Sequence, residues 1–241
     1  MITAKQIEEK TMTPEKRAIA CHDYIAFYIG RKLSYYFTIP FLYTNIRPDT
    51  ISKISLIPTI IGFLIQITTK SKLGLLVACL FYFIQDMLDG VDGNIARYRK
   101  QFSKYGSVWD AMSGYLMGCL CFLGTGVSAA HFNGLLGNSI EKEIYIVLGA
   151  LTGIAVIFPR LVMHKAITTA GKSESISEVK DREKFGIIQI LALNLSSTAG
   201  LVQVLRLIAI LINIQDLYII CYFVFFVALA IYTIVVSLRE K

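Results

Sequence analysis

The chain has 241 residues, of which 55% are hydrophobic and only 17% are charged, and its mean hydropathy is +0.59. A soluble domain rarely combines so much apolar character with so little charge, so the composition argues against a soluble protein. The net charge of +7 would favour nucleic-acid binding in a soluble chain. Here the basic residues lie between long apolar runs, where membrane orientation explains them better, and we expect no nucleic-acid partner.

The N-terminal 50 residues are expected to form a tail and an interfacial helix. No regular element is expected in residues 1–12, whereas Thr13-Pro14-Glu15 predicts a helix start with threonine as the N-cap and proline in the first turn. The residues that follow mix tyrosine, phenylalanine and isoleucine with basic side chains, which is typical of an amphipathic helix in the membrane interface. A soluble N-terminal helix is the alternative. The basic side chains are Lys16, Arg17, Arg31 and Lys32.

Residues 51–241 read as one all-α domain of six membrane spans. Each apolar segment is close to the ~20 residues that a helix needs to cross a bilayer. Two of the segments are longer, so tilting or protrusion is expected there. The predicted spans are 51–69, 73–92, 106–130, 144–164, 186–212 and 217–238.

The basic residues predict the orientation of these spans. Nineteen fall on one side of the predicted membrane and three on the other. The positive-inside rule therefore places both termini and the 89–114 segment in the cytoplasm, for a protein of the plasma or inner membrane. The three residues on the opposite side are Lys70, Lys72 and Lys142. The nineteen are Lys5, Lys10, Lys16, Arg17, Arg31, Lys32, Arg47, Lys53, Arg97, Arg99, Lys100, Lys104, Lys165, Lys172, Lys180, Arg182, Lys184, Arg239 and Lys241.

A charged, glycine-containing segment follows the second apolar run. Asp89 and Asp92 are three residues apart and share a helix face, and Asp110 begins the next span after a short basic link. Two antiparallel helices joined in this way would bring the three carboxylates together. Such a group at a membrane boundary needs a counter-charge, and its oxygen ligands suit Mg²⁺, Mn²⁺ or Ca²⁺.

Small residues beside these aspartates leave the helix backbones open. Gly93, Ala96 and Gly106 give a bulky ligand room to approach, and Arg97 can hold a phosphate in a bidentate fork. Together they describe a pyrophosphate or nucleotide site. The alternative is that the glycines serve close helix packing and the aspartates are ordinary span ends that face water.

The segment resembles the signature of the CDP-alcohol phosphotransferases, D-x2-D-G-x2-A-R-x8-G-x3-D-x3-D. Every position from the first aspartate to the third is matched, including the eight-residue gap. The six spans and the amphipathic N-terminal segment also look like this family, as does Pro48-Asp49-Thr50-Ile51-Ser52, where members often have Pro-Asn-x-x-Thr. The matched positions are Asp89, Asp92, Gly93, Ala96, Arg97, Gly106 and Asp110.

The resemblance implies a site for metal and nucleotide. Asp89, Asp92 and Asp110 would bind Mg²⁺ or Mn²⁺, and Asp92 with the four neighbouring motif residues Gly93, Ala96, Arg97 and Gly106 would frame cytidine diphosphate. The implied reaction transfers a substituted phosphate group from a CDP-alcohol to an alcohol acceptor, a lipid or a sugar phosphate, and releases CMP. The implied setting is phospholipid or phosphodiester-linked saccharide synthesis by a homodimer among membrane lipids.

One motif position departs from the family. The fourth aspartate, which in the family binds metal and is thought to be the general base, is replaced by Gly114. Asp86 lies one turn before Asp89 and is the only other carboxylate nearby. Asp110 and Asp86 are therefore the candidate catalytic carboxylates, with Asp86 supplying part of the missing role.

Two arginines in predicted spans are candidate contacts for an acceptor phosphate. Charged residues in spans usually face an interior cavity, and this argument applies to Arg160 and Arg206. The alternatives are snorkelling of Arg160 to the interface and pairing of Arg206 with a buried acid such as Asp86. A polar patch in the fifth span, Asn194 with residues 196–198, would either line a cavity or form interhelical hydrogen bonds.

Two other functions compete with the enzyme. The first is a non-catalytic homologue that binds nucleotide and metal as a partner or scaffold subunit, which Gly114 favours. The second is a transporter that uses the same carboxylates, although a transporter has no need for the eight-residue gap or for Arg97.

Overall fold

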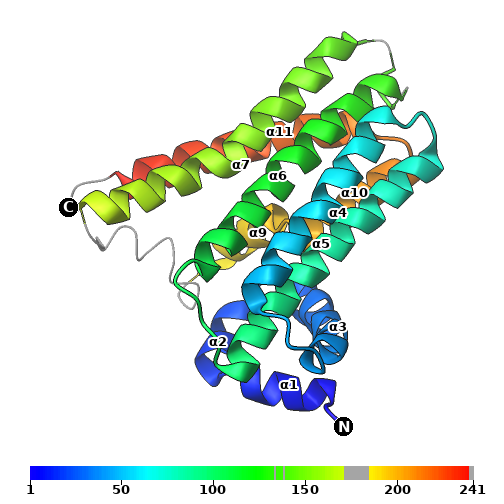
Figure 1. Cartoon of the computed structure of the whole chain (residues 1–241). Helices are drawn as coiled ribbons and strands as arrows, with labels where there is room; N and C mark the ends of the chain where they lie inside the picture. Colours follow the sequence, from blue (N-terminus) through cyan, green and yellow to red (C-terminus); the bar gives the residue numbers. More distant parts are fainter. Residues whose placement is uncertain (133, 138, 171–184, 239–241) are drawn as a thin grey trace.

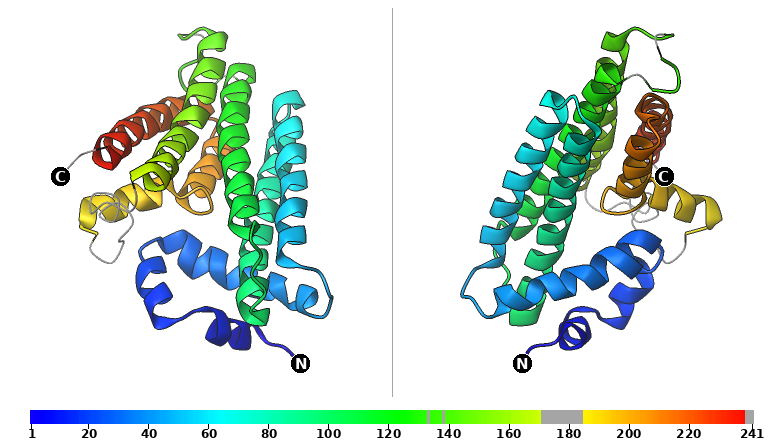
Figure 2. Two further views of the ribbon diagram at one scale, coloured as in Figure 1. Left: turned by 60° about the vertical axis from the view of Figure 1, so that its left-hand side comes forward. Right: turned by 90° about the vertical axis from the view of Figure 1, so that its right-hand side faces the viewer.

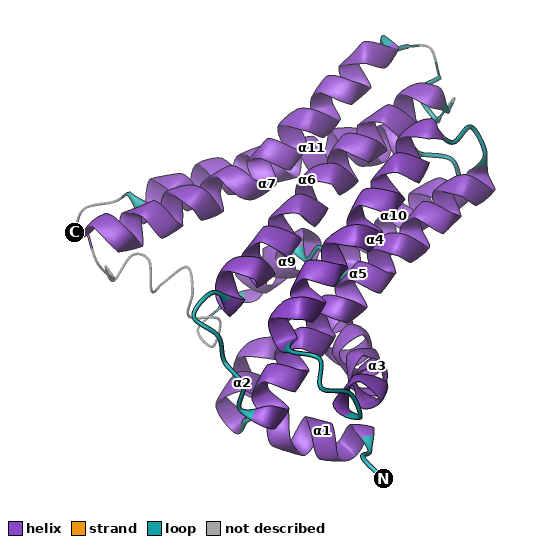
Figure 3. Ribbon diagram, in the orientation of Figure 1, coloured by secondary structure: helices purple, strands orange, loops and turns teal. Residues whose placement is uncertain are grey.

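The computed structural model describes residues 1–132, 134–137, 139–170 and 185–238. All regular structure in these ranges is helical, which confirms the predicted all-α fold (Figure 3). Several basic residues counted for the orientation lie outside the described ranges: Lys172, Lys180, Arg182, Lys184, Arg239 and Lys241. Five helices of the described part are long and apolar enough to cross a membrane: α4 (Pro48–Thr68), α5 (Lys72–Arg99), α6 (Gly106–His131), α7 (Lys142–Ala170) and α11 (Gln215–Ser237).

The predicted fifth span is broken. Residues 186–212 form α9 (Ile187–Ser196) and α10 (Leu201–Leu211), which meet at 59°. The break falls in the sequence Asn-Leu-Ser-Ser-Thr-Ala-Gly, where short hydroxyl side chains compete for backbone hydrogen bonds and glycine weakens the helix. Counted as one bent span, the pair completes six spans.

Helix α5 continues past the predicted end of the second span. It runs to Arg99 instead of stopping near residue 92, and Lys100 ends it in the left-handed conformation at φ 56°. The first half of the charged motif is therefore helical, so Asp89, Asp92 and Arg97 are fixed on one rigid element.

The long helices form a bundle that is capped at one end by the N-terminal helices (Figures 1 and 2). Helix α5 packs against α4, and α6 packs against both α4 and α7. Phe122, Tyr222 and Phe226 centre the apolar core between α6, α7, α10 and α11, with the Phe122 and Phe226 rings 5.2 Å apart. The N-terminal helices lie across the end of the bundle where α5 and α6 are joined.

The N-terminal cap consists of α1 (Ala4–Thr11), α2 (Pro14–Ala20), the π-helix η1 (Ala26–Arg31) and α3 (Lys32–Leu42). The predicted start of α2 is confirmed, because the Thr13 side chain accepts a hydrogen bond from the Lys16 N–H. The prediction of no regular element in residues 1–12 is wrong. Helix α1 begins with a capping box between Thr3 and Gln6, and Ile7 is fully buried in a cluster with α3, α4 and α5.

Hydrogen bonds hold the cap against the broken span. The Asn194 side chain accepts from the Tyr24 N–H at 2.9 Å and donates to the His22 carbonyl at 2.7 Å. The Ser197 hydroxyl donates to the Asp23 carboxylate at 2.6 Å. The polar patch of the fifth span thus joins two segments that are about 170 residues apart in sequence.

Asn194→Ala is expected to loosen the cap. The change leaves the Tyr24 N–H and the His22 carbonyl without their partners, and an unsatisfied buried group costs about 1–3 kcal/mol. Amide hydrogens of residues 22–27 should therefore exchange about ten to a hundred times faster in hydrogen-exchange mass spectrometry. Ser196→Ala is the control, because that hydroxyl bonds only within α9. Unchanged exchange in Asn194→Ala would contradict the proposed attachment.

Candidate active site

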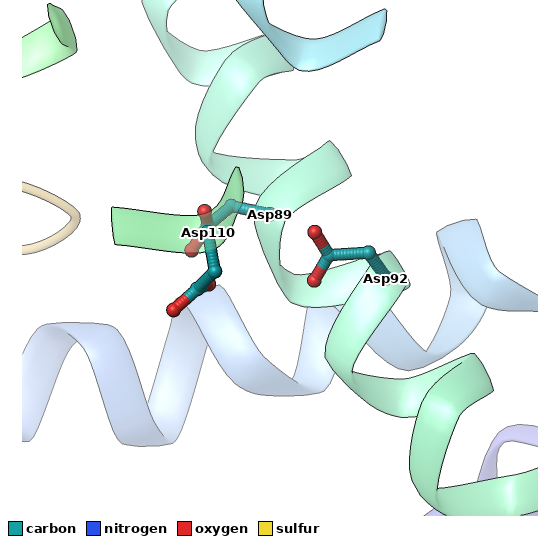
Figure 4. A group of neighbouring side chains, drawn as sticks. All are labelled: Asp89, Asp92 and Asp110. Carbon is teal, nitrogen blue, oxygen red and sulfur yellow. The ribbon is translucent and has the colours of Figure 1, made fainter. Parts of the chain in front are cut away.

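Three carboxylates meet where α5 and α6 approach each other under the N-terminal cap. Asp89 and Asp92 project from successive turns of α5, and Asp110 projects from the second turn of α6 (Figure 4). One carboxylate oxygen from each residue lies within 4.8 Å of the others. The structure therefore brings together the three aspartates that the sequence predicts as metal ligands.

The carboxylate cluster has no cationic side chain bonded to it within the described parts of the chain, where the one ion pair joins Arg17 to Glu8. Asp92 is buried and accepts a hydrogen bond from Ser52 of α4. Three adjacent carboxylates without a counter-charge repel one another. An all-oxygen donor set of this kind fits a divalent Mg²⁺ or Mn²⁺ ion.

A cavity of about 300 Å³ lies on one side of the cluster, between α4, α5 and the link into α6. Its walls include every residue predicted to frame the nucleotide, together with the metal-ligand candidate Asp110. The remainder of the lining comes from α4 and from the link and first turn of α6: Pro48, Asp49, Ser52, Gln101, Phe102, Ser103 and Ser107. The predicted residues in its lining are Asp92, Gly93, Ala96, Arg97 and Gly106.

Arg97 is held over a glycine. A Cβ atom on Gly93 would lie 2.9 Å from the guanidinium nitrogens, so any side chain there would displace Arg97. Arg97 donates to the Asn94 side chain at 3.2 Å. Asn94 in turn donates to Ser34 and Thr38 of α3 at 3.1 Å each, which ties the motif helix to the N-terminal cap.

A second cavity of about 240 Å³ lies between the cluster and the cap, lined by Lys16, Arg31 and Ser34 of the cap. Asp86 lines it together with Asp89, Asp92 and Asp110, so the predicted spare carboxylate shares a cavity with the cluster. Gly90 allows the cap to approach closely here, because a Cβ atom at this position would lie 2.7 Å from the Ser34 side chain.

Gly114 leaves open space where the family has its fourth aspartate. A Cβ atom built on Gly114 meets no atom within 4 Å. Ser113 beside it is fully buried, shares a 2.7 Å hydrogen bond with Ser55 and accepts a second from Gln85 at 3.3 Å. The local helix is therefore fixed by its neighbours, and a larger side chain at 114 has room.

The structure does not bring the two predicted phosphate-binding arginines into either cavity lining. Arg206 is buried, donates to the sulfurs of Cys121 and Cys79, and lies 4.4 Å from the Tyr82 ring centre. Arg160 is exposed on α7 and lies 5.9 Å from the ring centre of Tyr115. Their roles as phosphate contacts remain predictions that this geometry does not favour.

Sequence reasoning missed several residues that position the site. In the sequence, Ser52 stands out only as part of the segment before the first span, yet its hydroxyl donates a hydrogen bond to Asp92. Asn94 falls at an unspecified motif position, yet it connects Arg97 to the cap. What distinguishes Ser52 and Asn94 is that both are polar side chains that are fully or nearly buried among apolar helices.

Comparison with known proteins agrees with this geometry. The sequence profile of the CDP-alcohol phosphatidyltransferase family matches residues 46–235. The match begins just before α4 and ends within α11, so it leaves the N-terminal cap outside. No curated protein sequence gives a significant match to the chain.

Asp89→Asn is expected to weaken Mn²⁺ binding to the detergent-purified protein by at least about tenfold, because one anionic ligand of three becomes neutral. Electron paramagnetic resonance of free Mn²⁺ gives the affinity directly. Glu143→Gln, an exposed acid at the start of α7, is the matched control and should bind as the unaltered protein does. Equal affinities in the two variants would show that the cluster is not the ion site.

Proposed function

Since the chain belongs to the CDP-alcohol phosphatidyltransferase family, we propose that it transfers a substituted phosphate group from a CDP-alcohol to an acceptor hydroxyl and releases CMP. The observation that carries this proposal is the cavity beside the carboxylate cluster, whose lining contains all five predicted nucleotide residues. A transporter has no use for this combination of cavity, arginine and carboxylates.

The nucleotide is assigned to the 300 Å³ cavity. Its pyrophosphate would face Asp92 and Asp110, with Arg97 as the phosphate-binding fork. Asn94 keeps that guanidinium in place, and Gly93 provides the space that it occupies. A divalent ion held by Asp89, Asp92 and Asp110 would neutralise phosphate charge and polarise the phosphoryl group that is transferred.

The chemical step exchanges one phosphorus–oxygen bond for another. The acceptor oxygen bonds to the β-phosphorus while the bond from that phosphorus to the bridging oxygen breaks. CMP leaves with the electron pair, and the product is a phosphodiester. The hydroxyl proton must go to a base, which in this chain cannot be residue 114.

Asp86 is proposed to receive that proton. It lines the 240 Å³ cavity with Asp89 and Asp110, and that cavity shares Asp92, Gly93, Arg97 and Asp110 with the cavity assigned to the nucleotide. An in-line displacement requires an acceptor entering there to approach the β-phosphorus from the face opposite the CMP leaving group. Asp110 lines both cavities and would contribute to catalysis by helping to hold the divalent ion.

The proposed setting is the cytoplasmic face of a plasma or inner membrane, in the synthesis of a phospholipid or a phosphodiester-linked saccharide. The excess of basic residues around the N-terminal cap and the 97–104 link supports this orientation. A homodimer is proposed from the family resemblance. The alternative function is a nucleotide- and metal-binding scaffold subunit, and Gly114 is the feature that favours it.

CDP is expected to bind the detergent-purified protein in calorimetry only when Mg²⁺ or Mn²⁺ is present, because the pyrophosphate and the carboxylates repel without a cation. Asp92→Asn should lose this binding, whereas the distant Glu143→Gln should keep it. A folded sample that binds no CDP would overturn the enzyme and the nucleotide-binding scaffold alike. Metal-dependent binding would justify a CMP-release screen over CDP-alcohols and acceptors.

Gly114→Asp is expected to raise CMP release by about a hundredfold, because general-base catalysis is worth ~10²–10⁴ and the side chain has open space. In the unaltered background, Asp86→Asn should lower turnover by about a hundredfold. In the Gly114→Asp background the same change should cost less than about tenfold, since the family base is restored.

Gly114→Asn controls for size without acidity and should give no gain. Two results would refute the role of Asp86. The first is unchanged turnover and Mn²⁺ affinity in Asp86→Asn, and the second is an equal loss in both backgrounds. A fall in turnover for Gly114→Asp would show instead that the open space is itself used by the substrate.

A further inference from the structure

The lining of the 240 Å³ cavity contains three cationic residues, Lys16, Arg31 and Arg97, in addition to its aspartates. Lys16 comes from α2, Arg31 from the last residue of η1 and Arg97 from α5. Arg97 lines both cavities, whereas Lys16 and Arg31 line only this one. The two residues from the cap therefore add positive charge to the cavity that is not assigned to the nucleotide.

Lys16 and Arg31 form no ion pair with a carboxylate in the described ranges, whereas Arg97 interacts electrostatically with Asp92 and Asp110 without a direct ion pair. Among the described residues, the Nε atoms of Arg31 and Arg97 are buried without a hydrogen-bond partner. Burial, together with the positive charges of Arg97 and Arg31, lowers the pKa of Lys16 to about 7. Cations gathered in this way repel one another, and a bound anion relieves both the repulsion and the missing hydrogen bonds.

The fold restrains the segment that carries Arg31. The π-helical turn that ends at Arg31 continues directly into α3, and π-turns often occur at functional sites. Asp23, between α2 and η1, is anchored by Ser197, and Ala199 of the same break lines the cavity. Arg31 thus lies between the Asp23–Ser197 hydrogen bond and α3.

We propose that Lys16 and Arg31 bind a phosphomonoester group of the acceptor and so determine which acceptors the protein accepts. The identification of the bound phosphomonoester as an acceptor rests on the proposed function. The anion site itself is argued only from the residues that line the cavity. A dianionic phosphate matches two or three converging cations and the fork geometry of arginine. Both residues belong to the N-terminal cap and lie outside the 46–235 family match.

The test measures binding of two phosphomonoesters to the full-length detergent-purified protein with CDP and Mg²⁺ present. Glycerol 3-phosphate represents a water-soluble acceptor, and phosphatidic acid in mixed micelles, compared with phosphatidylcholine, represents a lipid acceptor. We expect one of the two to bind. Arg31→Gln and Lys16→Gln should each weaken that binding by at least about tenfold, while Arg31→Lys should retain most of it.

Lys32→Gln is the matched control, since Lys32 is exposed beside Arg31 and lines neither cavity. It should bind as the unaltered protein does, and CDP affinity should stay within about twofold in every variant. Absence of binding by both phosphomonoesters, or unaltered binding in Arg31→Gln and Lys16→Gln, would overturn the proposal. An equal loss of CDP binding would also overturn it, because the cations would then belong to the nucleotide site. Arg31-dependent phosphomonoester binding without metal-dependent CDP binding would sustain the anion site while refuting the proposed function.

Discussion

The fold of this protein has to hold three carboxylates within 4.8 Å of one another. Such a cluster repels itself unless a cation joins it, so the surrounding helices must resist separation whenever no cation is bound. Ser52 restrains Asp92 from α4, and the Asn94 bonds to Ser34 and Thr38 restrain α5 against the cap. These buried polar contacts therefore act on the helix that carries two of the three carboxylates.

The carboxylates also separate two cavities of different chemical character. One is bounded by small motif residues and residues of the α5–α6 link, while the other is bounded by the cationic residues of the cap. Asp92, Gly93, Arg97 and Asp110 line both. A phosphoryl group that passes from a molecule in one cavity to a molecule in the other would therefore pass beside the residues common to both linings.

The parts of this arrangement that the sequence could predict are those determined by residues that are close together in the chain. The i, i+3 spacing of Asp89 and Asp92 predicted their shared helix face, and the short link to Asp110 predicted the cluster. The break at residues 197–200 was not predicted, because hydropathy averages over a few polar residues. The positions of Lys16 and Arg31 depend on how the cap docks, and amphipathic periodicity says only that such residues avoid the apolar face.

The attachment of the cap to the broken span has a consequence for how acceptor preference can change. Ala199 and the cationic residues line the same cavity, and Asp23–Ser197 and the Asn194 bonds hold their two segments together. A chimera that exchanges residues 1–45 alone would separate these partners and distort both walls. To change the acceptor preference of this protein, residues 1–45 and 194–200 must therefore be exchanged together. Nearly the whole membrane domain lies between these two segments in sequence.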